Sequence, residues 1–318
     1  MAAQGRDLLR TLSLSMGVAP NKASSSTTLP YPIYWSPNFS SITEVDNQSF
    51  SDYHSLQVQF KRSLAHGLQG LANYTWSHST DNSSSGTFVN TPGYFFQPSQ
   101  NHGSSDFDIR HNFSAALTYD IPAPQGNRVL NAVLRDWSLS NLWVARTGLP
   151  MNVTFNESNG LTGSSTRRPD VVPGQPLKIA DPTVAGGWRL NPAAFAVPPA
   201  AGVEGTLGRN AIYEMGAWQT DMGLHRSFRV TERIKTEFRM EAFNILNHPN
   251  FHFTSSSNLT LGSTGSPVAT ALTVPATWGH VTQTLARAYG GGSNTGGFNP
   301  LFQSGGPRSM QFALRVSF

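Results

Sequence analysis

The chain has 318 residues and a formal net charge of +4, with 13% charged residues, 38% hydrophobic residues and no cysteine. Charged residues are about half as frequent as in a typical soluble protein. No basic cluster is longer than Arg167 and Arg168. This excludes a nucleic-acid-binding surface, because such a surface needs clustered positive charge. No stretch approaches 18 uninterrupted apolar residues, so a transmembrane helix is excluded, whereas a membrane-spanning strand is not.

The pattern of the chain changes near residue 50. The first fifty residues are irregular, and at most Ile33–Val45 adds a strand there. Beyond them, apolar and polar side chains alternate with a period of two, which is typical of strands whose two faces meet different environments. Seven such strands are predicted, in chain order: Leu56–Leu64, Leu68–Ser79, Phe107–Tyr119, Leu134–Thr147, Trp218–Val230, Ile234–Leu246 and Arg308–Phe318.

The third predicted strand shows the alternation most clearly. From Phe107 to Tyr119 the odd positions are mostly apolar and the even positions, from Asp108, mostly polar. At ~3.3 Å per residue the segment is about 40 Å long, and a tilt near 45° projects that length to about 30 Å. This is the thickness of the hydrocarbon core of a bilayer. One face of the strand is therefore expected to touch lipid and the other a wet lumen.

The connections between the predicted strands alternate between short and long. The short ones are "AHG" (Ala65–Gly67), "IPAPQGN" (Ile121–Asn127) and "TER" (Thr231–Arg233), and the long ones are Thr80–Ser105, Gly148–Ala217 and His248–Thr277. Outer-membrane barrels have short periplasmic turns and long extracellular loops. We expect an aromatic girdle at each boundary: Tyr74, Trp76, Phe107 and Trp218 outside, and Tyr119, Trp137, Phe228 and Phe318 inside.

No motif in the sequence predicts catalysis. There is no GxSxG elbow and no phosphate-binding loop. His248 and His252 are four residues apart, but Pro249 argues against a helix that would align them on a metal, so a polar loop is the prediction. We therefore expect no enzymatic activity, no catalytic residue, no metal and no cofactor, and the ligand-binding residues are not assigned.

Two charged groups are interpreted as lumen features. The first group is Asp106, Asp108, Arg110 and His111. Alternation places Asp108 and Arg110 on the polar face and His111 on the other face, so an ion pair in the lumen is preferred over an active site. On the sixth strand, alternating signs favour a pore-lining ladder over a set of ligand contacts: Lys235, Glu237, Arg239 and Glu241.

Five segments in this order resemble the C-terminal barrel half of TonB-dependent receptors, and among them the Oar-like group, which carries a carboxypeptidase-regulatory-like domain. They are "YHSLQVQFKRSLAHGLQGLANYTWSHSTD", "FDIRHNFSAALTYDIP", "LGRNAI", "FRMEAFNILNHPNF" and "RSMQFALRVSF". The resemblance covers most of residues 50–318. It implies an outer-membrane transporter of about 22 strands that is closed by a plug and driven by the TonB complex. The resemblance also implies that the barrel assembly machinery recognises the terminal aromatic residue of the transporter, here Phe318.

The chain departs from that pattern by its few strands and by lacking a plug and a TonB box. The expected fold is therefore all-β, an incomplete antiparallel transmembrane barrel of about seven to nine strands. We expect residues 1–50 to be an irregular segment from an outer loop of the parent barrel, and residues 51–318 to be the C-terminal part of that barrel. Its expected partners are outer-membrane lipid, the assembly machinery, an unknown extracellular ligand, and TonB only through the missing N-terminal region.

Two other interpretations stay open. A small passive porin would close by itself with about eight strands. A soluble extracellular β-rich binding or adhesion module would have to cover large apolar faces with a partner.

Overall fold

A computed structural model describes residues 49–84, 101–122, 126, 128–159, 163–199, 204–229, 231, 234–253, 259–265, 269–286 and 305–318. The predicted strand Ile33–Val45 and the segment 1–48 lie outside these residues. Within them no helix is long and apolar enough to cross a membrane.

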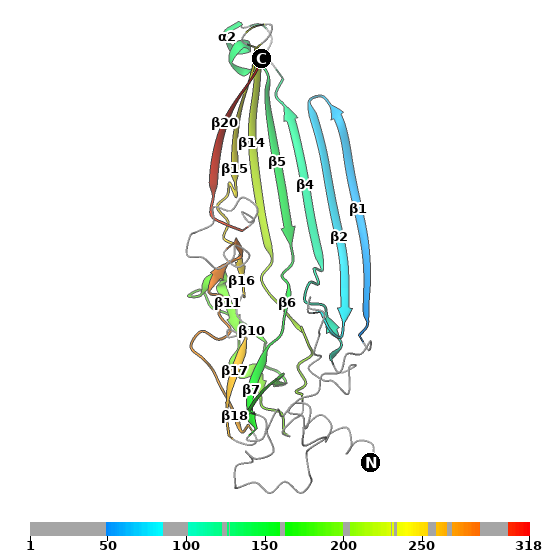
Figure 1. The fold of residues 1–318 in the computed structure, drawn as a ribbon, viewed down its shortest axis with the longest axis vertical. Helices are drawn as coiled ribbons and strands as arrows, with labels where there is room; N and C mark the ends of the chain where they lie inside the picture. Colours follow the sequence, from blue (N-terminus) through cyan, green and yellow to red (C-terminus); the bar gives the residue numbers. More distant parts are fainter. Residues whose placement is uncertain are drawn as a thin grey trace, which may run out of the picture.

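An eight-stranded antiparallel sheet dominates the molecule (Figure 1). Seven of its strands are long and follow the order of the chain, and the short β3 (Gly103–Ser104) pairs with β2. The long strands are β1 (Ser51–Ala65), β2 (Leu68–Asp81), β4 (His111–Asp120), β5 (Trp137–Arg146), β14 (Ala217–Arg229), β15 (Lys235–Phe243) and β20 (Ser309–Ser317). All seven predicted strands are therefore confirmed.

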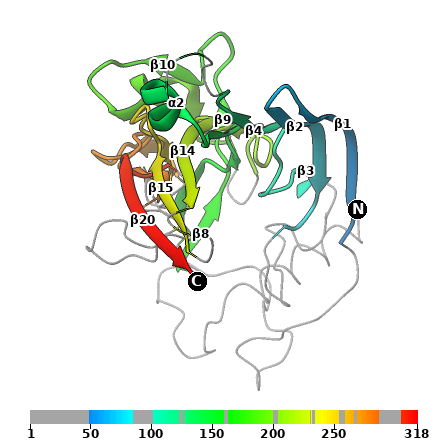
Figure 2. The same ribbon diagram turned by 90° about the horizontal axis from the view of Figure 1, so that it is seen from above.

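The sheet is an open arc (Figure 2). In the described part of the chain, β1 and β20 each pair with one strand only, so they form the two edges of the sheet. Because neighbouring strands are antiparallel, the first and the seventh strand run in the same direction. The fold is thus an unclosed barrel segment, as expected.

The two faces of the sheet differ in polarity along single rows of paired residues. One row across five strands reads Val58, Tyr74, Phe113, Ala145 and Trp218. The neighbouring row, on the opposite face, reads Gln59, Asn73, Ser114, Val144 and Gln219. We call these the apolar face and the polar face.

The apolar face of the sheet lies uncovered in the structure. Phe60 on β1 is 66% exposed and Phe312 on β20 is 65% exposed. Leaving one large apolar side chain in water costs about 1.5–3 kcal/mol relative to burying it, so a surface with many of them requires an apolar solvent. This arrangement fits a lipid-facing surface and argues against the soluble module.

Short connections lie at one end of the sheet, the turn end. His66 and Gly67 have φ angles of 54° and 78°, as a two-residue hairpin turn requires. A Cβ on Gly67 would also lie 2.6 Å from the carbonyl oxygen of Asp120. In the short connection between β14 and β15, the hydroxyl of Thr231 accepts a hydrogen bond from the backbone N–H of Ile234 at 3.1 Å.

The connection between β4 and β5 differs from the predicted simple turn. It contains a helix, α2 (Arg128–Leu134), so the predicted start of the strand at Leu134 is wrong and β5 begins at Trp137. The indole nitrogen of Trp137 donates to the carbonyl oxygen of Val133 at 2.8 Å, which joins the helix to the strand.

The start of the third predicted strand is also wrong. The strand β4 begins at His111 rather than at Phe107. Phe107, Asp108 and Arg110 lie in the preceding loop, where the carboxylate of Asp108 accepts the backbone N–H of Ser79 at 2.7 Å. A side chain that binds backbone groups in this way competes with the pairing of a strand.

The buried core lies in the long connections and not in the sheet. The described parts of residues 148–216 and 249–286 form a loop layer at the other end of the long strands, the loop end (Figure 1). Its buried side chains are Met151, Val153, Phe155, Leu190, Ala194, Phe195, Leu207, Ile212, Phe253, Leu261, Ala269, Trp278 and Val281.

Seven of these residues lie in short elements of the loop layer, and the other six lie between such elements. The strands are β6 (Pro150–Met151), β7 (Thr154–Asn159), β8 (Gly163–Arg167), β9 (Asp170–Val171), β10 (Lys178–Ala180), β11 (Trp188–Leu190), β12 (Phe195–Ala196), β13 (Ile212–Tyr213), β16 (Phe251–His252), β17 (Thr260–Thr264), β18 (Ala271–Thr273) and β19 (Gln283–Thr284). Two 3₁₀ turns cover Ala185–Gly187 and Pro192–Ala194.

Candidate functional site: the polar face and the loop layer

The charged residues of β15 lie on the polar face, as predicted. Arg239 is 3.1 Å from Glu237 and 3.9 Å from Glu241, so its ion pairs run along its own strand, where residues two apart share a face. Across the strands, Glu237 is in register with Arg315, and the side-chain amide of Gln311 donates to Glu241. The predicted ladder exists, and part of its charge is balanced within β15 rather than between strands.

Asp108 forms a buried polar cluster at the loop end. Its side chain is 1% exposed, and its carboxylate lies 3.2 Å from both Arg110 Nε and His78 Nδ1. The hydroxyl of Tyr213, from β13, donates to it at 2.9 Å. The predicted ion pair between Asp108 and Arg110 is present, but the prediction that it lies on a spanning strand is wrong: it joins the loop before β4 to the loop layer.

A second buried cluster surrounds Arg209, within the "LGRNAI" segment. Its guanidinium is 2.5 Å from Asp81 Oδ1 and 3.1 Å from Asp106 Oδ1. The neighbouring Asn210 donates to Asp106 at 2.6 Å and to the carbonyl oxygen of Ser104 at 2.8 Å. The long connection between β5 and β14 is thereby attached to the end of β2.

A glycine permits this contact. A Cβ at Gly103 would lie 2.4 Å from the carbonyl oxygen of Arg209, so only a residue without a side chain allows the two backbones to meet. We call the contacts of Arg209 and Asn210 with Asp81, Asp106 and Ser104 the arginine clamp.

The third long connection is held by Glu214. Its carboxylate lies 2.6 Å from His252 Nδ1 and accepts the Phe253 backbone N–H at 3.2 Å. The ring of His248 lies 4.0 Å from that of Trp218, centroid to centroid. The two histidines predicted to lie in a plain polar loop therefore make separate contacts that fix this loop, and they do not converge on one point.

Burial affects one further cation in the loop layer. The pKa of Lys178 is lowered by loss of hydration, although nearby Glu214 acts in the opposite direction. Its ammonium group lies 4.2 Å from the ring centroid of Trp188 and donates to the carbonyl oxygen of Tyr213. Among the described residues, no group of three or more His, Cys, Asp or Glu side chains is placed to hold a metal ion.

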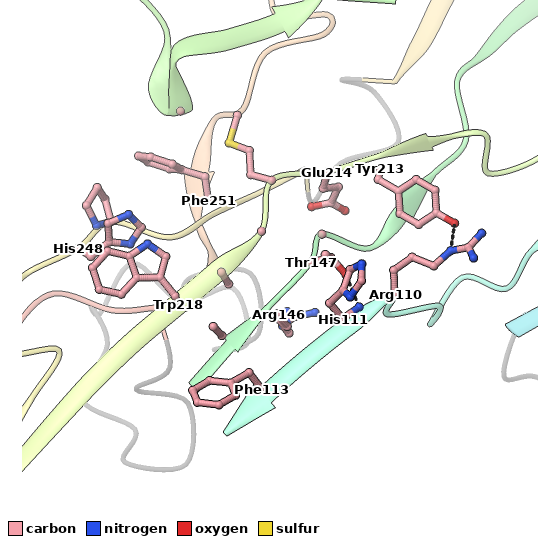
Figure 3. A pocket seen from close by; sticks show the side chains of 17 residues that line it. Arg110, His111, Phe113, Arg146, Thr147, Tyr213, Glu214, Trp218, His248 and Phe251 are labelled. Carbon is pink, nitrogen blue, oxygen red and sulfur yellow. Dashed lines mark hydrogen bonds between the residues drawn. The ribbon is translucent and has the colours of Figure 1, made fainter. Parts of the chain in front are cut away.

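A pocket of about 840 Å³ opens where the apolar face meets the loop layer (Figure 3). Phe113 of β4, Ala145 of β5 and Trp218 of β14 form its strand side, and Met215 and Phe251 belong to its loop side. No sequence motif indicated this pocket, because its wall combines three strands with loop residues from two connections.

The expected aromatic girdles are partly visible. At the loop end, Tyr74, Trp76 and Phe107 are exposed, and Trp218 is half-buried because it stacks on Trp143 and His248. At the turn end, the exposed aromatic residues are Tyr119 and Phe318, while Trp137 and Phe228 are half-buried beside Arg226.

A comparison with protein families identifies the family to which this architecture belongs. Residues 2–290 match the model of an outer membrane beta barrel domain, which covers most of the chain. The chain therefore belongs to the outer membrane beta barrel family, and it resides in the outer membrane. Neither the curated proteins nor the solved structures give a match. In this frame the loop end is extracellular and the turn end periplasmic.

Proposed function

We propose that the chain is the C-terminal part of the barrel of a TonB-dependent receptor of the Oar-like group, which imports an extracellular ligand once the rest of the barrel and the plug are present. The observation that carries the proposal is a sheet of seven long strands whose two edge strands run in the same direction. This region of the receptor is not enzymatic.

The direction of the edge strands opposes closure of the described sheet on itself. Single-chain barrels of bacterial outer membranes have an even number of antiparallel strands, whereas direct pairing of β1 with β20 would be parallel. In lipid, each backbone group left without a partner costs several kcal/mol. Further strands are therefore needed to join the two edges, and a large receptor barrel supplies them.

The polar face and the loop layer suit the two tasks of a receptor. The ladder around Arg239 offers both signs of charge along a wet wall, where a polar ligand exchanges its hydration for protein contacts. The arginine clamp and the Asp108 cluster fix the long loops above that wall, so they present a preformed surface to a ligand outside the cell. In such a receptor TonB contacts the N-terminal region, and we assign Phe318 as the contact with the assembly machinery.

Reconstitution of the full chain in planar bilayers tests the proposal. We expect no stable unitary conductance from the chain alone. The double variant Ser55→Cys/Ser77→Cys reports assembly, because these residues are in register on β1 and β2 and the natural chain has no cysteine. A disulfide without conductance supports the proposal.

A stable, ohmic conductance step from the assembled chain would overturn the proposal in favour of a small porin. That outcome requires an eighth strand, for which Ile33–Val45 is the sequence candidate. Cysteines placed in that segment and at Ala313 on the β20 edge would then form an intrachain disulfide, and they remain unlinked if the receptor assignment is right.

A further inference from the structure

The helix α2 at the turn end exposes its apolar side. Val129 is 72% exposed, Leu130 49% and Val133 54%. At 3.6 residues per turn these three side chains lie within about 100° of one another around the helix axis, and we call them the apolar stripe of α2. A helix on the surface of a soluble protein turns such a stripe toward the core. Here the stripe faces outward, so it needs an apolar environment from outside the chain.

Two hydrogen bonds place α2 beside the apolar face of the sheet. The indole nitrogen of Trp137 donates to the carbonyl oxygen of Val133 at 2.8 Å, and the guanidinium of Arg226 donates to that of Ala132. Trp137 and Arg226 are in register with each other, and Arg226 shares a face with Trp218 because the two are an even number of residues apart on β14. Figure 2 shows α2 outside the arc of the strands. The helix therefore adjoins the surface that lipid covers.

The depth of α2 in the membrane follows from the strands that hold it. Trp137 is the first residue of β5, and Arg226 is the fourth residue from the end of β14, so α2 lies at the periplasmic boundary between headgroups and hydrocarbon (Figure 1). The guanidinium carbon of Arg226 lies 5.4 Å from the ring centroid of Trp137 and 5.7 Å from that of Phe228. A lipid-facing cation is tolerated at this level, and the carbonyl end of a helix offers it negative partial charge.

The end of α2 has its hydrogen bonds completed by protein groups. The last four carbonyl groups of an α-helix have no partner inside the helix. Three of these groups in α2 accept hydrogen bonds, namely those of Asn131, Ala132 and Val133. The donor to Asn131 is the backbone N–H of Arg135, at 2.9 Å, and the other two donors are the side chains of Arg226 and Trp137. In water the solvent would serve these carbonyls, whereas in lipid an unsatisfied one is costly. The arrangement therefore suits a helix end that is withdrawn from water.

We propose that α2 is an interfacial anchor in the periplasmic leaflet of the outer membrane, with the apolar stripe against acyl chains. Bilayer lipid is the occupant of the stripe, because the stripe continues the apolar face of the sheet at the level where that face ends. The anchor fixes how deep the turn end lies in the membrane. This inference goes beyond the proposed function and holds for a receptor and for a porin alike.

Two neighbouring positions that a bilayer treats differently test the anchor. Val133 is 54% exposed and the side chain of Arg135 is 56% exposed, so both are accessible in the protein alone. Helical spacing places Arg135 on the side opposite the stripe. The natural chain has no cysteine, which permits a single spin label in each of the full-length variants Val129→Cys, Val133→Cys and, as the control, Arg135→Cys. The variants are placed in phosphatidylcholine vesicles, and protection of the strands from protease confirms assembly.

Electron paramagnetic resonance measures how often each label collides with oxygen, which concentrates in hydrocarbon, and with a nickel chelate supplied on both sides of the membrane. We expect the ratio of oxygen to nickel collisions to be about tenfold higher at positions 129 and 133 than at 135, because hydrocarbon excludes the hydrated chelate. Equal and low ratios at the three positions would refute the anchor and assign the stripe to a protein partner. Equal and high ratios would refute it as well, because the helix would then lie wholly within the hydrocarbon.

Discussion

Two adjacent alanines on β4 give a direct test of which face of the sheet meets lipid. Ala115 is in register with Ala72 and Trp143, on the apolar face, and Ala116 is in register with Leu71 and Leu142, on the polar face. Replacing each by arginine makes the same chemical change at the same depth. Ala116→Arg is therefore the matched control for Ala115→Arg.

The position of Ala115 sets the expected magnitude. The strand extends from His111 to Asp120, so about 13 Å of strand lies on one side of Ala115 and about 17 Å on the other. Such a residue lies near the middle of the bilayer, where an arginine facing lipid costs about 2–4 kcal/mol. This cost corresponds to a fall of about 30- to 900-fold in the ratio of assembled to unassembled chain.

The assay is urea unfolding of the full chain in phosphatidylcholine vesicles, followed by protection of the strands from protease. We expect Ala115→Arg to lower the unfolding midpoint strongly and Ala116→Arg to change it little, because an arginine on the polar face stays hydrated. Equal losses in the two variants, or a larger loss in Ala116→Arg, would show that the assignment of the two faces is wrong.

Three further predictions concern the loops and turns. Asp108→Ala should cost about 1–3 kcal/mol of local stability, because it leaves the Ser79 backbone N–H and the Tyr213 hydroxyl without their buried acceptor; hydrogen exchange of the Ser79 amide measures the loss, and unchanged exchange would contradict it. Gly67→Ala should destabilise the first hairpin more than Gly126→Ala destabilises the connection between β4 and β5. Both glycines have a positive φ, but only at Gly67 would the added Cβ collide with a backbone atom. The urea unfolding midpoints of the two variants measure the difference. Hydrogen bonds from Thr183, and then its contact with Arg189, lower the pKa of Asp181 below its ordinary 3.8, so this turn is stabilised above about pH 4 and loses that contribution as the pH falls through the lowered pKa. The protection factor of the Thr183 amide, its exchange rate relative to an unstructured peptide at the same pH, should therefore fall in acid in the natural chain, and Asp181→Asn should remove this change in protection.

The number of long strands and the character of their faces were predictable because alternation is a local property. Residues such as Phe60 and Tyr74 show their face through their immediate neighbours, and the pattern survives whatever the loops do. The ends of the strands were less predictable. Alternation continues through Phe107 and Asp108, yet the hydrogen bonds that Asp108 accepts from Ser79 and Tyr213 hold this segment in a loop outside the sheet.

The helix α2 was missed for a different reason. Its seven residues make only about two helical turns, too few for a repeated apolar pattern to stand out, and the preceding "IPAPQGN" is typical of a turn. The carbonyl oxygens of Val133 and Ala132 are bonded by Trp137 and Arg226 respectively. Tertiary contacts of this kind stabilise short helices that are marginal by themselves.

The candidate site could be predicted only in part. The ladder on β15 followed from alternation, whereas the arginine clamp joins Asp81 to Arg209 across 128 positions. The segment "LGRNAI" is one of the five that carry the family resemblance, but the sequence predicts no contact or function for it. The core of the loop layer was also hard to predict. Met151, Val153 and Phe155 alternate with polar residues, but so short a run does not show that they pack against distant residues such as Trp278.

The long reach of the arginine clamp constrains the order in which the molecule forms. Contacts between residues so far apart in the sequence are slow to form, because the entropy of closing the intervening loop is lost before any contact compensates it. Pairing of β2, β4, β5 and β14 brings Asp81 and Arg209 within reach, so the loop layer condenses after these strands have paired. Until the loop layer packs, apolar residues such as Val153 and Phe155 remain exposed on the extracellular side. The interval between strand pairing and loop packing is therefore the stage of biogenesis at which the chain is most vulnerable to proteases and to aggregation.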